Sequence, residues 1–89
     1  MSDLISLRNL GPTSAQMLME VGIDSRAELE RLGAAMAFQI VRHRRPDVSL
    51  NLLWALHGAL TDRDWRSLSA DEKARLRAEV AVPLRVRPG

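Results

Sequence analysis

One stretch of twelve residues, SLNLLWALHGAL at positions 49–60, constrains the fold of this chain more than any other. Wound as a helix, its leucine, alanine and tryptophan side chains surround most of the circumference and leave almost no polar face. A helix that is apolar nearly all round is usually the buried centre of a bundle. We therefore expect this segment to be a core helix, with shorter helices packed around it.

Glycine, proline and capping residues divide the rest of the chain into short helices. Apolar positions at helical spacing predict that Ala34, Ala37, Phe38 and Val41 are buried in a helix over 34–44, and that Ala74, Leu76 and Val80 face the core from a last helix. The first expected segment runs from Ser2 or Asp3 to Leu10, and the next helix, over 14–21, is capped by Thr13 or Ser14 and stopped by Gly22. A short helix then begins at the Ser25–Glu28 capping box and ends at Gly33. The remaining expected helices are 34–44, 49–60, and one from the Ser69–Glu72 capping box to about Val80.

The composition agrees with a helical core. The chain has 89 residues, enough for one small domain, and is 46% hydrophobic with three aromatic residues. We therefore predict an all-α fold, a compact bundle of about five short helices over residues 1–80. Residues 81–89, AVPLRVRPG, contain two prolines and a glycine, and we expect a flexible tail there.

Residues 7–23, LRNLGPTSAQMLMEVGI, form a turn between two apolar runs. The stretch resembles the helix-hairpin-helix pattern, in which a hydrophobic–glycine turn leads into a helix whose first amides face a DNA phosphate. Helix N-terminal amides lack internal partners, and the helix dipole there favours an anion. On this interpretation Gly11, Thr13 and Ser14 hold one phosphate, with Arg8 as the nearby cation.

A purely structural turn stays open as the alternative. The hairpin pattern prefers glycine where this chain has Asn9, and it often carries a lysine where this chain has Thr13. The residues that follow are acidic, Glu20 and Asp24 among them, and they would repel a phosphate backbone.

The charge is unevenly distributed along the chain. Residues 1–41 have three arginines and five acids, whereas residues 42–89 have ten basic residues and six acids. The densest basic stretch, Arg42-His43-Arg44-Arg45, ends a predicted helix. In one interpretation, these cations stabilise the negative end of their own helix dipole. In the other, Arg42, Arg44 and Arg45 form a patch that binds nucleic-acid phosphates or acidic residues of a partner.

No constellation of residues predicts catalysis or metal binding. The chain has no cysteine and only His43 and His57, and it lacks a glycine-rich nucleotide loop. We therefore expect neither an enzyme nor a cofactor or metal site.

No apolar run approaches the length of a membrane span and no charged-then-apolar leader opens the chain, which predicts a cytoplasmic protein. Trp54, if exposed, and Trp65 are candidates for a partner interface, since tryptophan is enriched at binding hot spots.

Taken together, the stretches LRNLGPTSAQMLMEVGI (7–23), AELERLGA (27–34), SLNLLWALHGAL (49–60) and the W-x-x-L-x-x-x-x-K segment (65–73) resemble the C-terminal domain of TfoX/Sxy-type proteins. These proteins are bacterial regulators of DNA-uptake competence. The resemblance implies an all-helical domain with a helix-hairpin-helix-like N-terminal portion. It also implies a link to transcriptional regulation, where the full-length family works with a cyclic-AMP-dependent activator.

The longer proteins of this family carry an N-terminal α/β domain, for which 89 residues leave no room. We therefore expect a stand-alone version or an excised domain, to which a competence role does not transfer directly. Two functions from different classes stay open. One is a regulatory module that contacts DNA phosphates without reading bases. The other is a module that binds a transcriptional regulator protein or itself, as a monomer or weak dimer.

Overall fold

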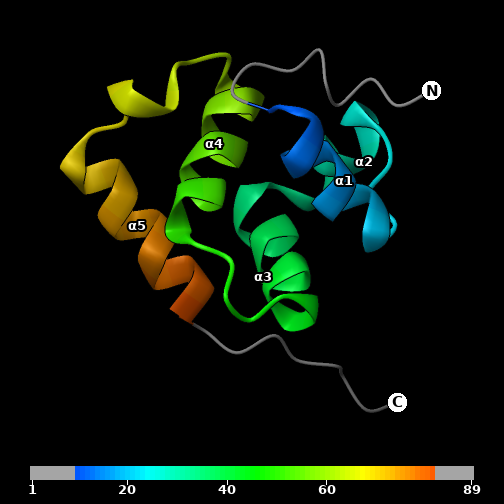
Figure 1. Ribbon diagram of the computed structural model, residues 1–89. Coiled ribbons are helices and arrows are strands. Elements are labelled where there is room, and N and C mark those ends of the chain that lie inside the picture. The colour runs from blue at the N-terminus through cyan, green and yellow to red at the C-terminus, as the bar shows by residue number, and fades with distance from the viewer. Residues whose placement is uncertain (1–9, 82–89) are drawn as a thin grey trace.

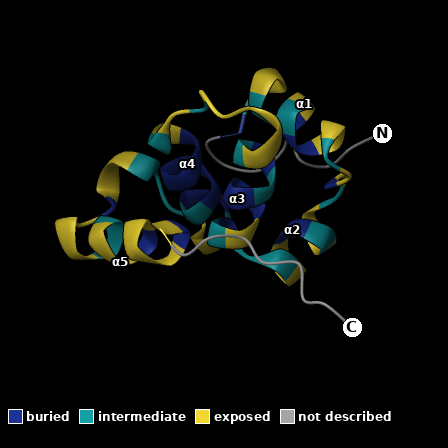
Figure 2. Ribbon diagram, turned by 90° about the horizontal axis from the view of Figure 1, so that it is seen from below, coloured by how far each residue is buried: buried dark blue, intermediate teal, exposed yellow. Residues whose placement is uncertain are grey.

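The computed structural model describes residues 10–81, and in it α4 (Leu50–Thr61) lies among the other helices (Figure 1). Its burial confirms the expectation from its apolar sequence, and Figure 2 shows the buried residues concentrated on α4 and α3. Leu53 and Leu56 are fully buried. The buried residues of α4 are Leu52, Leu53, Trp54, Ala55, Leu56, Gly58 and Ala59.

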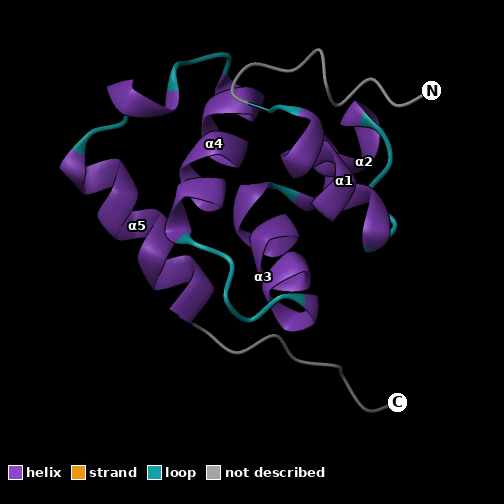
Figure 3. Cartoon of the chain, viewed as in Figure 1, coloured by secondary structure: helices purple, strands orange, loops and turns teal. Residues whose placement is uncertain are grey.

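Every regular element within residues 10–81 is helical (Figure 3), which confirms the all-α prediction. The expected segment ending at Leu10, with Arg8, and the tail beyond Ala81 lie outside the described residues. The elements are α1 (Pro12–Glu20), α2 (Arg26–Leu32), α3 (Ala34–Arg44), α4, the 3₁₀ turn η2 (Trp65–Ser67) and α5 (Ala70–Ala81).

Helix α3 connects the two sides of the molecule, because it contacts α1, α2, α4 and α5. Its bounds agree with the predicted helix over 34–44, and the predicted apolar face is buried in full. The Gln39 side chain is buried on the same helix, and its Nε2 donates a hydrogen bond to the carbonyl oxygen of Val80, 3.3 Å away in α5. A buried amide needs such a partner, because an unpaired polar group in the core is costly.

Gly22 ends α1 as predicted. Its φ of +88° lies in the left-handed region, which glycine reaches without strain. Its N–H donates to the Met19 carbonyl at 3.0 Å, and the Ile23 N–H donates to the Leu18 carbonyl at 2.9 Å. This is the Schellman pair of bonds, and it turns the chain so that Ile23 enters the core.

The predicted start of α1 was wrong. The helix begins at Pro12 with Gly11 as its N-cap, so Thr13 and Ser14 lie inside the first turn and neither caps it. The Ala15 N–H donates to the Gly11 carbonyl at 3.0 Å. Proline is favoured in the first turn, because its φ is already helical and its missing N–H would have no partner there.

The two predicted capping boxes differ. At α5 both bonds form: the Glu72 N–H donates to Ser69 Oγ at 3.1 Å, and the Ser69 N–H donates to Glu72 Oε1 at 3.0 Å. At α2 the Glu28 N–H donates to Ser25 Oγ at 3.2 Å, but the Glu28 carboxylate pairs with Arg31 on its own helix. The hydrogen bond from Arg31 lowers the pKa of Glu28.

Only part of the predicted apolar face of α5 is buried. Leu76 and Val80 enter the core, whereas Ala74 is exposed, contrary to expectation. Leu68 is buried just before α5, and Trp65 packs against the core while half-buried. Within residues 10–81 no helix has both the length and the apolar character of a membrane span.

Candidate interaction surfaces

Arg42 belongs structurally to the contact between α3 and α5. Its guanidinium donates a 2.7 Å hydrogen bond to the Val80 carbonyl, the same oxygen that Gln39 reaches. Its Cζ also lies 5.4 Å from the centre of the Phe38 ring, within the range of a cation–π contact. Arg42 therefore gives a carbonyl in the last turn of α5 a donor from another helix.

Arg44 and Arg45 both face Glu20 at the C-terminal end of α1. Arg45 is held in a bidentate pair, with its Nε 3.0 Å and a terminal nitrogen 2.8 Å from the Glu20 carboxylate. Arg44 Nε lies 3.7 Å from the same carboxylate. The densest basic stretch of the sequence thus lies against an acid from the other half of the chain, which reduces the positive charge it presents.

The hairpin residues lie at the opposite end of α1. Glu20, with its two arginines, is separated from Thr13 by roughly 10 Å along the helix axis. The structure therefore does not bring the two predicted phosphate-binding groups together. No side chain caps α1, its first turn has no acid, and a Cβ built on Gly11 would meet nothing within 4 Å.

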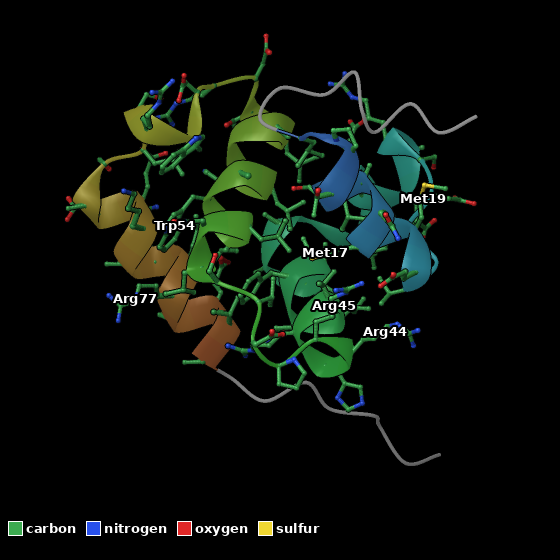
Figure 4. All side chains as sticks on the ribbon, in the orientation of Figure 1. Met17, Met19, Arg44, Arg45, Trp54 and Arg77 are labelled. Atoms are coloured by element: carbon green, nitrogen blue, oxygen red, sulfur yellow. The ribbon has the colours of Figure 1, made fainter. Side chains whose placement is uncertain are left out.

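Trp54 does not meet the condition of exposure under which it would mark an interface. It is 7% exposed, within the core, and Lys73 Nζ lies 5.7 Å from the centre of its ring. Figure 4 shows Trp54 between α4 and α5. Trp65 is different, because it is half-buried and lines a groove.

We call this groove the α1–α4 groove. It has a volume of about 300 Å³ and is lined by Ser14, Met17, Val48, Ser49, Asn51, Leu52, Ala55 and Trp65. Among the described residues its lining has no ionisable side chain, and the polar groups are two hydroxyls, one amide and the indole N–H of Trp65. The sequence singled out Ser14 and Trp65 for different functions, and the fold places them on one surface. Met17 and Asn51 were missed, because nothing local to them indicates which helix face becomes a groove wall.

A second depression, the α3–α5 groove, lies beside α5. It consists of two adjoining hollows of about 370 and 380 Å³ that share His57, Leu76 and Glu79. The remaining lining residues are Leu32, Gly33, Ala34, Ala35, Met36, Leu60 and Thr61 in one hollow, and Glu72 and Arg75 in the other.

Glu72 is the most strongly held acid in this region. Arg63 donates to its two oxygens at 2.5 and 2.9 Å, and His57 Nε2 lies 3.6 Å from Oε2. These bonds, first from Arg63 and then from the Ser69 amide, lower the pKa of Glu72 to about 2. Such a carboxylate is ionised at neutral pH and is fully occupied by structural partners, so it is poorly suited to act as a general acid or base. Across the described part of the chain, no three His, Asp or Glu side chains are grouped so that they could hold a metal ion.

Comparison with known proteins places this fold in a family. The model of the TfoX C-terminal domain matches residues 1–80. Two crystal structures of Listeria monocytogenes proteins share the fold. One, an uncharacterized protein in a triclinic form, has a TM-score of 0.79 and 31% identity over 83% of this chain and 84% of that chain.

The other, a protein of unknown function in a tetragonal form, has a TM-score of 0.81 and 30% identity over 85% of this chain and 94% of that chain. No curated protein matches this sequence. The family match over residues 1–80 confirms the resemblance seen in the sequence. The chain belongs to the TfoX C-terminal domain family.

Proposed function

We propose that this chain is a non-catalytic regulatory module, related to TfoX-like proteins, that acts by binding another protein through the α1–α4 groove. One observation carries the proposal. Ser14 and Trp65 lie far apart in the sequence, yet they line the same groove together with Met17. Family membership supports the relation to TfoX-like proteins, and a transcriptional regulator is the kind of partner that this relation suggests.

The chemistry of the groove suits an apolar anchor on a protein. Its floor is formed by Leu52 and Ala55, and its volume of about 300 Å³ is at the small end for a ligand pocket. Methionine adapts its shape to different partners, and tryptophan is enriched at binding hot spots. Met17 and Trp65 supply both properties at the rim.

The electrostatics favour protein over nucleic acid as the main ligand. The lining residues that the structure describes carry no charge. The most basic stretch lies elsewhere, where Arg42 is bound to Val80, and Arg44 and Arg45 face Glu20. Binding in a neutral groove should depend little on salt, whereas phosphate contacts weaken steeply as salt rises.

Contact with a DNA phosphate is a second candidate, and one observation favours it. Helix α1 starts without a side-chain cap and without an acid in its first turn, unlike α2 and α5. The amides of Thr13 and Ser14 precede the first intrahelical bond, and no described residue lies within 4 Å of where a Cβ on Gly11 would be. An anion is favoured at such a helix end.

Site-specific photo-cross-linking in the native cells tests the protein-binding proposal. A photoreactive amino acid replaces Asn51, an exposed residue of the α1–α4 groove, and in a matched control it replaces Arg77, which Figure 4 shows on α5 at the far edge of the molecule. We expect one defined protein adduct from position 51, weakened by Trp65→Ala, and none from position 77. Equal adducts from both positions would contradict the proposal.

Fluorescence anisotropy of a labelled duplex, at low and moderate salt, tests the second candidate. The informative variant is Thr13→Glu, because a carboxylate in the first turn of α1 favours the helix dipole while it repels a phosphate. Salt-sensitive binding that this variant abolishes, with its thermal midpoint unchanged or raised, would support DNA contact. No binding at low salt would exclude it for this chain.

A further inference from the structure

Arg75 and Glu79 are one helical turn apart on α5, and neither forms an ion pair with any residue in the range 10–81. Both are exposed at the rim of the α3–α5 groove. Of the two acids one turn before Arg75, Glu72 is already held by Arg63, and Asp71 forms no ion pair within residues 10–81. Among the described residues, this rim therefore carries one cation and one anion without an ion-pair partner.

The surface around the two charges is apolar and made of small residues. Ala74 and Ala78 are exposed on α5. On the other side of the rim, the groove contains Met36, which is 40% exposed, above the half-buried Leu60. Small side chains let another helix approach closely, and an exposed methionine beside a groove is apolar area that a partner can cover.

Helix geometry places the two charges on one side. Successive residues turn by about 100°, so Arg75 and Glu79 point about 40° apart while Arg77 points to the opposite side. When two copies of a helix pack antiparallel about a two-fold axis level with position 77, position 75 of each copy meets position 79 of the other. The arrangement is therefore complementary to itself.

We propose that a second copy of this chain docks here, with the two α5 helices antiparallel. Two symmetric Arg75–Glu79 ion pairs join the copies, and the second copy covers Met36 and the mouth of the α3–α5 groove. This surface is separate from the α1–α4 groove, so the inference does not depend on the proposed function.

The charge pattern favours a second copy over a polyanion. The same side of α5 carries Asp71 besides Glu79, and two acids near one free arginine would repel phosphates. One helix and a groove edge form a small interface compared with the roughly 800 Å² per partner of a stable complex. The dimer is therefore weak, with a dissociation constant in the micromolar range or above.

Sedimentation velocity on the full chain tests the pairing, over concentrations from about 10 to 500 µM that bracket a micromolar dissociation constant. We expect a concentration-dependent dimer. Arg75→Glu and Glu79→Arg each turn two attractive contacts into two like-charge contacts, so each should raise the dissociation constant by about tenfold or more. Both positions are exposed, and circular dichroism checks that the variants fold.

Mixing and combining the variants provides the decisive comparison. An equimolar mixture of Arg75→Glu and Glu79→Arg restores opposite charges at both contacts, and it should dimerise although each variant alone is monomeric. The double variant with both changes should dimerise within about threefold of the original chain, because the pair is only reversed. Arg77→Glu, on the other side of α5, is the matched control and should leave dimerisation unchanged.

A chain that is monomeric at every concentration would overturn the proposal. Singly changed variants that dimerise as well as the original would also overturn it, as would a mixture and a double variant that both stay monomeric. None of these outcomes affects the cross-linking at Asn51, which reports on the other groove.

Discussion

Two groups of arginines differ in their surroundings. The first group lies at the C-terminal end of α3 and consists of Arg42, Arg44 and Arg45. The second group lies between the ends of α5 and consists of Arg75 and Arg77. The first group is bound by Val80 and Glu20, which come from parts of the chain far away in sequence. The second group has no ion pair within the described residues, and Glu72, one turn before Arg75, is held by Arg63. A dense run of basic residues is therefore not the same as available positive charge. What decides availability is the set of acceptors that the fold brings to each guanidinium.

The largest change in stability is expected for Phe38→Ala. This substitution removes a fully buried ring and the surface on which Arg42 stacks. We expect the free energy of unfolding to fall by about 3 to 5 kcal/mol, as for other buried aromatic side chains. Urea titration followed by circular dichroism measures the loss. Met36→Ala, an exposed change on the same helix, is the control and should cost far less.

Next in size is Arg42→Ala. It removes a charged hydrogen bond to the Val80 carbonyl, and we expect a loss of about 1 to 2 kcal/mol. The matched control is Arg44→Ala two residues later, whose contact to Glu20 is 3.7 Å long and exposed. Equal losses for the two variants in urea titration would show that Arg42 is not distinguished by its place between α3 and α5.

Low pH should reduce the stability of the fold at the start of α5. The pKa of Glu72 is lowered from 4.5 to about 2 in the folded chain, so its contribution to stability is complete above the unfolded value near pH 4.5 and disappears as the pH falls toward 2. The thermal midpoint should fall over this range. Glu72→Gln separates this carboxylate from the others, because the difference between the two chains should be largest near neutral pH and vanish near pH 2.

Glu20→Gln should have a small effect on stability, about 0.5 kcal/mol, because its arginine partners are largely exposed. The same change leaves Arg44 and Arg45 without their acid. If the duplex binds this chain at all, its affinity should then rise, and the rise should disappear at high salt. A lower affinity in the anisotropy titration would mean that the basic stretch is not an alternative phosphate site.

The smallest expected effect is that of Arg77→Ala, within about 0.5 kcal/mol of the original chain, as for most exposed positions. Its side chain points away from the core at the edge of the molecule (Figure 4). A loss above 1 kcal/mol in urea titration would mean that Arg77 has a structural partner, and the contrast between the two arginine groups would fail.

Local features of the fold could be predicted from the sequence. The helix over 34–44, the glycine stop at Gly22 and the capping box of Ser69 with Glu72 all depend on residues within one or two helical turns of each other. Such signals can be recognised within short stretches of sequence. The error at the start of α1 arose because Pro12 and the caps Thr13 and Ser14 competed for the same place and the proline prevailed.

The interaction surfaces could not be predicted in the same way. Glu20 meets Arg45 from 25 positions away, and Arg42 meets Val80 from 38 positions away. No pattern within either segment indicates that pairing, because it depends on how α3 packs against α1 and α5. Trp54 illustrates the same limit, since a tryptophan on a core helix is buried or exposed according to what its neighbours cover.

The bonds that reach Val80 also bear on how the chain completes its folding. The Val80 carbonyl, which accepts from both Gln39 and Arg42, is synthesised about 40 residues after them. Without the last turn of α5, Gln39 and Arg42 lose this shared acceptor and the core loses the side chain of Val80. The last turn of α5 therefore completes both the polar and the apolar parts of the contact between α3 and α5.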